Sequence, residues 1–134
     1  MIDAHAALIY TMVLVSAADQ DMTDAELRTI GEIVRFLPAF RAFDVAALPR
    51  VASDCAALLD SEDGLDHALA EVKAAMPAKL RETAYAVACD VAAADERATP
   101  EKQRMLEILE DLLDIDALVA AAIERAARAR HMRL

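Results

Sequence analysis

The chain has 134 residues and a net charge of −10, from 24 acidic and 14 basic residues. This length is typical of one domain, and the charge argues against a nucleic-acid partner because phosphate binding needs a basic surface. With only two glycines and four prolines, the chain has too few turn-forming residues for an all-β protein. We therefore predict a single all-α domain over residues 1–134.

The first predicted helix, from residue 3 or 4 to residue 18, is apolar on nearly every side, which is typical of a central helix surrounded by others. Its 13-residue apolar run, 6–18, is too short to span a bilayer. The second helix is predicted to begin at Thr23, which forms a capping box with Glu26, three positions later. Pro38 marks its end.

The middle of the chain predicts two more helices, 44–59 and 65–76. Pro49 lies inside the first of them, so we expect one turn and then a kink or a restart at that point. Pro77 suits the first position of a fifth helix, which we expect to reach residue 94.

Two further helices complete a predicted compact bundle of about seven helices. The sixth is predicted to begin with Thr99 as cap and Pro100 in its first position. The seventh runs from residue 117 to about 130 after Asp116 as its cap. The apolar residues that we expect it to bury are Leu118, Val119, Ala122 and Ile123.

An internal duplication is the main feature of the sequence. A shift of 76 positions aligns Ala17, Ala18, Asp19, Thr23 and Arg28 with Ala93, Ala94, Asp95, Thr99 and Arg104. The first helix thereby matches the fifth, the second matches the sixth, and each pair is joined by a short acidic loop. Two such pairs can pack about a pseudo-two-fold axis. The sequence leaves open whether the two loops meet in space.

The two acidic loops are the candidate site. Carboxylate oxygens are preferred ligands of calcium and magnesium, and both loops are rich in them. The predicted metal ligands are Asp19, Asp21, Glu26, Asp95 and Glu101. The first loop is not an EF-hand, because Asp24 stands where that motif needs glycine and Ile30 where it needs a bidentate glutamate.

A simpler interpretation of the same carboxylates is helix capping. Acidic side chains near a helix N-terminus stabilise it by ~0.3–1 kcal/mol with no ligand involved. A duplicated fold also duplicates its caps, so repetition of the motif does not by itself indicate a metal. Both interpretations stay open from the residues alone.

A family resemblance extends over essentially the whole chain. The motif Ala18-Asp19-Gln20-Asp21-Met22-Thr23-Asp24-Ala25-Glu26, with its second copy Ala94-Asp95-Glu96-Arg97-Ala98-Thr99-Pro100-Glu101, resembles the TerB-like family. That family is named for tellurite resistance and includes the N-terminal domain of a membrane-bound DnaJ-type co-chaperone. The resemblance implies an all-helical stress-response domain that is not an enzyme, with an acidic metal-binding face.

Three positions depart from the family pattern. Gln20 follows Asp19 and Glu96 follows Asp95, at the position where the family pattern usually has glycine. Lys102 stands where the second copy would match Glu26, and Glu101 lies one place early. If only one loop binds a cation, we expect it to be the first.

Two functions follow as hypotheses. The first is a non-enzymatic cytoplasmic accessory domain that binds a divalent cation (calcium, magnesium, manganese or zinc) in a stress response. The alternative is a protein-interaction module in which the acidic residues cap helices and form a docking face. Expected partners are other stress-response proteins, membrane-associated ones included, and the oligomeric state is left open. Cys55 and Cys89 are expected to be buried thiols of a reducing compartment.

The basic residues are unevenly distributed. Four arginines, Arg125, Arg128, Arg130 and Arg133, follow the last acidic residue, Glu124. The residues up to Glu124 then carry 10 bases and 24 acids, a charge of −14, and the tail carries +4. Cations are favourable near a helix C-terminus, and the same tail also suits an acidic partner or an anionic lipid surface.

Overall fold

The computed structural model describes residues 1–95 and 97–134. This part of the chain is all-helical and contains no strand, which confirms the predicted fold class. The α-helices are α1 (Ala4–Ala17), α2 (Asp24–Phe36), α3 (Leu48–Leu59), α4 (Gly64–Ala75), α5 (Arg81–Ala94), α6 (Pro100–Leu112) and α7 (Ala117–Arg130). Three short 3-10 helices accompany them, η1 (Pro38–Phe40), η2 (Val45–Ala47) and η3 (Ala78–Leu80).

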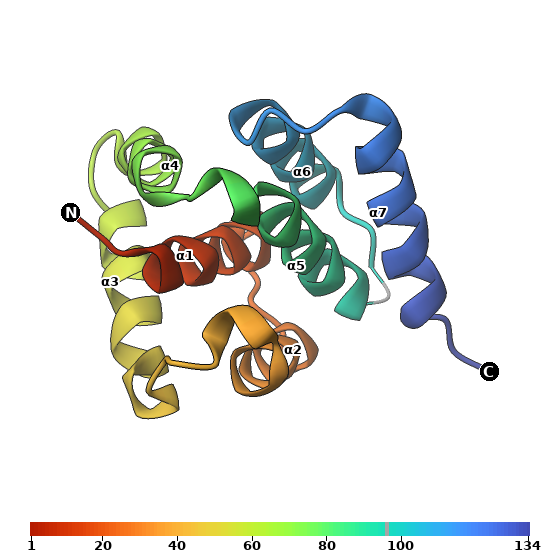
Figure 1. Ribbon diagram of the computed structural model, residues 1–134, viewed down its shortest axis with the longest axis horizontal. Helices are drawn as coiled ribbons and strands as arrows, with labels where there is room; N and C mark the ends of the chain where they lie inside the picture. The colour runs from red at the N-terminus through yellow and green to blue at the C-terminus, as the bar shows by residue number, and fades with distance from the viewer. Residues whose placement is uncertain (96) are drawn as a thin grey trace.

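Helix α1 is the centre of the bundle. It lies beside α5, with α3 and α4 on one side of the pair, α6 and α7 on the other, and α2 across one face (Figure 1). Every residue from Ala7 to Ser16 is buried. The apolar character of α1 on all sides is therefore explained, because other helices cover it in every direction.

The duplication is also visible in the packing. Helix α2 packs on α5 just as α6 packs on α1, and α1 packs on α5 itself. Exchanging α1 with α5 and α2 with α6 leaves this set of contacts unchanged, which is the behaviour of two copies related by a pseudo-two-fold axis. The connections that follow α1 and α5 therefore lie at equivalent ends of neighbouring helices (Figure 1).

The predicted helix starts are largely confirmed. Thr23 and Glu26 form a complete capping box at the start of α2. The Thr99 hydroxyl accepts a hydrogen bond from a backbone N–H at the start of α6, and the Asp116 carboxylate does so at the start of α7. The restart expected at Pro49 also occurs, because η2 gives way to α3 at Leu48.

Two predictions were wrong. Pro77 does not begin the fifth helix: it precedes η3, and α5 begins only at Arg81. The predicted buried face of α7 is also wrong: Leu118 is 82% exposed, Ala122 is exposed as well, and Val119 and Ile123 are half-buried. Helix α7 packs on α5 through a narrow seam that includes Ala120 and Ala127, so the larger side chain on the neighbouring stripe faces outward.

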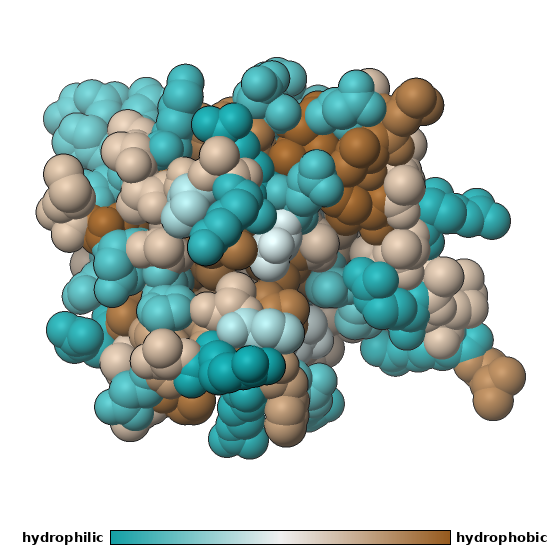
Figure 2. All heavy atoms as spheres, viewed as in Figure 1, coloured by the Kyte–Doolittle hydropathy of each residue, from teal (hydrophilic) through white to brown (hydrophobic). Residues whose placement is uncertain are grey.

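The remaining features concern the thiols and the membrane. Cys55 and Cys89 are both free and buried, as predicted. Within the two described ranges, none of the helices combines the length and apolarity needed to cross a bilayer. An apolar area is nevertheless exposed over the region where α6 leads into α7 (Figure 2).

Candidate functional site: the junction of the two acidic loops

The two acidic loops meet. Arg97 belongs to the second loop and Asp21 to the first, and the distance from Nη2 of Arg97 to Oδ2 of Asp21 is 2.7 Å. The same guanidinium is 3.2 Å from Oδ2 of Asp95 in its own loop. Arg97 therefore links one carboxylate of each copy, at the surface of the molecule.

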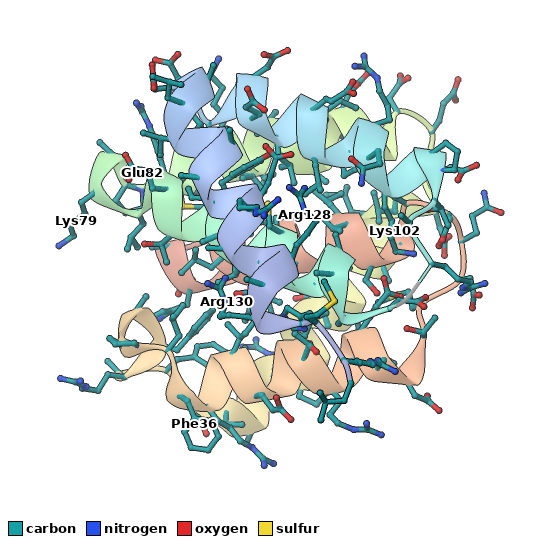
Figure 3. All side chains as sticks on the ribbon, turned by 90° about the vertical axis from the view of Figure 1, so that its right-hand side faces the viewer. Phe36, Lys79, Glu82, Lys102, Arg128 and Arg130 are labelled. Carbon is teal, nitrogen blue, oxygen red and sulfur yellow. The ribbon has the colours of Figure 1, made fainter. Side chains whose placement is uncertain are left out.

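A second cation lies deeper in the same junction. Lys102, in the first turn of α6, has a side chain only 2% exposed. Its Nζ donates a hydrogen bond of 2.6 Å to Oδ2 of Asp19 and lies 3.2 Å from Oε2 of Glu26. Figure 3 shows Lys102 at the end of α6 that adjoins the second loop. The ammonium thus connects the start of α6 to both ends of the first loop.

Glu26 has two separate tasks, one for each carboxylate oxygen. Oε1 accepts a hydrogen bond of 2.9 Å from the backbone N–H of Thr23, which completes the capping box. Oε2 is fully buried and accepts no hydrogen bond of good geometry among the described residues. That oxygen faces the Lys102 ammonium, which supplies its compensating charge.

The charges shift one another in the expected directions. The hydrogen bond from Lys102 lowers the pKa of the Asp19 carboxyl below its ordinary value, although partial burial opposes the shift. Burial lowers the pKa of Lys102, but its hydrogen bond to Asp19 and its close contact with the Glu26 carboxylate outweigh that effect, so the net shift is upward. The hydrogen bonds from Arg97 lower the pKa of Asp95. Asp19, Asp95 and Lys102 are therefore charged at neutral pH.

Each loop has the same local geometry. The backbone N–H of Asp21 donates to Oδ1 of Asp19 at 3.1 Å, and that of Arg97 donates to Oδ1 of Asp95 at 3.1 Å. These are Asx turns, in which an aspartate side chain closes the loop two residues on. The two Asp residues are thus occupied in part by shaping their own loops. Glu96, the other acid of the second loop, lies outside the described residues.

Four of the five predicted ligands come together. Asp19 and Glu26 face Lys102, while Asp21 and Asp95 face Arg97. Glu101 is exposed on the first turn of α6 and takes part in none of the described ion pairs. Two basic residues that the ligand prediction did not include therefore lie at the centre of the site.

A signal for both bases was present in the sequence. Moving 76 positions from Asp21 leads to Arg97, and from Glu26 to Lys102. In each case the second copy carries a base where the first carries an acid. Two equivalent residues that meet at the axis between the copies would repel each other if both were acidic. They attract each other when one is acidic and the other is basic.

The arrangement does not match a divalent-cation site. Calcium takes six to eight oxygen ligands at about 2.3–2.6 Å. Within residues 1–95 and 97–134, no group of three or more His, Cys, Asp or Glu side chains is placed to hold a metal. The Lys102 ammonium lies in the position between Asp19 and Glu26 that a metal ion would need. Cation binding by the five predicted ligands stays a prediction, and it requires Lys102 to move.

A cavity of about 270 Å³ adjoins the junction, between α5, α6 and α7. Lys102, Asp95 and Cys89 are among the residues that line it. Burial raises the pKa of the Cys89 thiol to about 12, so at neutral pH the thiol is protonated and a poor nucleophile. The cavity is therefore lined by both acidic and basic side chains, and its cysteine is not activated for nucleophilic attack.

The family follows from the whole chain. Residues 5–127 match the family model described as tellurite resistance protein TerB. The chain belongs to the TerB family. No curated protein and no solved structure matches it. The matched residues include both acidic loops, so the junction lies inside the TerB-family part of the chain.

Proposed function

We propose that this TerB-family domain is a non-enzymatic, cytoplasmic docking module that binds a basic segment of a partner protein. The docking face is the α3–α4 hairpin, defined here as residues 51–72. Partners of this kind in a stress response, membrane-associated complexes included, would present clustered lysines or arginines. The link to tellurite resistance rests on the family description.

The distribution of unpaired acidic charge supports the proposal. Residues 51–72 contain no lysine or arginine and carry a charge of −6, from Asp54, Asp60, Glu62, Asp63, Asp66 and Glu71. Arg50 and Lys73 lie in the same two helices just outside this range, and counting them leaves a charge of −4. All of these acidic residues except the half-buried Glu71 are exposed. None of them takes part in the ion pairs of the described residues. The acidic loops differ, because Lys102 and Arg97 already neutralise much of their charge.

Charge separation across the molecule favours the same face. The hairpin lies at the opposite side of the bundle from α7, which bears Arg125, Arg128 and Arg130 (Figure 1). Figure 3 shows Arg128 and Arg130 on the α7 side. At physiological ionic strength, exposed charges further apart than ~8 Å are largely screened. A basic ligand near the hairpin would therefore experience its carboxylates and little of the α7 arginines.

A binding assay with a matched control tests the docking face. The hairpin variant carries Asp60→Asn, Glu62→Gln and Asp66→Asn. The control variant carries Glu101→Gln, Glu107→Gln and Asp111→Asn, three exposed acids of α6, and so has the same net charge. The ligand is a short lysine-rich peptide, measured by fluorescence anisotropy at several salt concentrations.

The hairpin variant should bind the peptide roughly tenfold more weakly, because each exposed charge pair contributes up to ~0.5 kcal/mol. The α6 control should bind like the wild type. Equal losses in the two variants would show that binding follows net charge alone, and the proposal of a defined docking face would then be wrong.

A divalent cation remains a second candidate ligand of this domain. The observation in its favour is the gathering of Asp19, Glu26 and Asp95 around one junction. The resident ammonium and guanidinium oppose it. Calorimetric titration of the demetallated wild type with divalent ions tests this candidate.

A further inference from the structure

The residues that meet at the junction are each other's equivalents in the duplication. Asp21 contacts Arg97, and Glu26 contacts Lys102, and both pairs are 76 positions apart. Only side chains next to a two-fold axis can contact their own counterparts. The local frame is also the same in both copies: the backbone N–H of Glu26 donates to the Thr23 hydroxyl, and that of Lys102 to the Thr99 hydroxyl.

A true duplicate would have a conflict at this axis. If both copies kept the first copy's residues, a glutamate would face a glutamate in a buried place, and an aspartate would face an aspartate at the surface. Buried like charges cannot both stay ionised unless a cation lies between them. The conflict has two solutions with charged residues: a cation bound from solution, or a base in place of one acid.

We propose that Lys102 is a built-in replacement for a bound cation, so that this domain holds its two halves together independently of divalent ions. The corollary is specific: Lys102→Glu should convert the junction into a divalent-cation site whose ligands are Asp19, Glu26 and the introduced carboxylate. The inference goes beyond the docking function and does not depend on it.

The chemistry of the ammonium fits this role. Lysine presents a compact, strongly localised charge with three donors, which resembles a small cation more closely than the planar guanidinium does. Its Nζ has one carboxylate at 2.6 Å and a second at 3.2 Å, on side chains that are almost entirely buried. The Glu26 Oε2 atom accepts no well-formed hydrogen bond among the described residues and points at the ammonium. Such an oxygen is available as a ligand once the ammonium is removed.

Thermal unfolding of metal-free protein, with and without millimolar calcium, magnesium or manganese, tests the proposal. The wild-type midpoint should shift by less than about 1 °C with any ion, because nothing binds. Lys102→Glu should have a lower midpoint without ions, and at least one ion should raise it by more than about 5 °C. Lys102→Glu combined with Asp19→Asn should lose most of that response.

A second variant keeps the test decisive if Lys102→Glu does not fold without ions. Lys102→Gln removes the ammonium and adds no charge, so it leaves Asp19 and Glu26 as the remaining ligands. It should fold, with a smaller upward shift in the presence of the same ion. The proposal is overturned if the wild type responds to an ion and Asp19→Asn abolishes that response, or if neither Lys102 variant responds to any ion.

Discussion

The Lys102 ammonium lies 3.2 Å from Oε2 of Glu26, the residue that occupies the equivalent place in the other half of the duplicated chain. The pair is buried, and Asp19 completes it at 2.6 Å. A single residue therefore serves both halves: its backbone N–H donates to the Thr99 hydroxyl at the start of α6, and its ammonium neutralises carboxylates of the first half. The junction is therefore a structural element of this domain.

Removing the buried ammonium should destabilise the fold strongly. Lys102→Met keeps the aliphatic length and leaves Asp19 and Glu26 without a compensating charge. Loss of one partner of a buried pair typically costs about 3–5 kcal/mol. Urea unfolding should show this loss in the free energy of unfolding. Arg97→Met is the matched control, since it removes the exposed base of the same junction, and it should remain close to the wild type. Equal effects of the two substitutions would contradict the assignment of Lys102 as the buried link.

The acid side of the stability profile should depend on Asp19. Its pKa is lowered in the fold from an ordinary value of 3.8. A lowered carboxyl pKa contributes stability that is fully present above the ordinary value and is lost as the pH falls through the folded value. Asp19→Asn should therefore be less stable than the wild type by about 1–3 kcal/mol at pH 7, and the difference should shrink below about pH 4. A difference that is unchanged at low pH would show that packing, and not charge, accounts for it.

The two glycines should respond oppositely to alanine. A Cβ at Gly64, the first residue of α4, would lie 2.0 Å from the backbone oxygen of Leu58, so Gly64→Ala should cost at least ~2 kcal/mol. Gly31 lies inside α2 with open space around it, and Gly31→Ala should add about 0.5–1 kcal/mol. Thermal unfolding of the two variants checks both signs. Destabilisation by Gly31→Ala would mean that α2 is packed more tightly there than described.

Gln20 adopts a left-handed backbone conformation, with φ of 62°. Residues with a Cβ are strained in that region and glycine is not, so this backbone position suits glycine better than glutamine. Gln20→Gly should therefore raise the free energy of unfolding by about 0.5–1 kcal/mol, with the junction otherwise intact. Chemical unfolding measures the change. A loss of stability would indicate that the Gln20 side chain makes a contribution larger than the strain.

Local sequence signals predicted the fold because they report local physics. The capping box of Thr23 and the all-round apolar character of α1 depend on residues within a few positions, and both are confirmed. The face of α7 that packs against the bundle was not predictable in this way. Its seam uses alanines, so hydrophobicity did not distinguish the packed stripe from the one that carries Leu118.

The acidic residues of the candidate site could be predicted from the sequence, but its basic residues could not, because their contacts are distant in the chain. The acidic residues of both loops are evident from their motif, whereas the burial of Lys102 depends on partners 83 and 76 positions away. A lysine in the first turn of a helix normally indicates a solvated surface. Its place in the duplication, opposite Glu26, was the one sequence observation that pointed to a different role.

The most direct test of this account is calorimetric titration of demetallated wild type and Lys102→Glu with calcium, magnesium, manganese and zinc at neutral pH. We predict no binding heat for the wild type and saturable binding of at least one ion by Lys102→Glu. Saturable binding by the wild type that Asp19→Asn removes would contradict the account and would establish the acidic loops as a metal site.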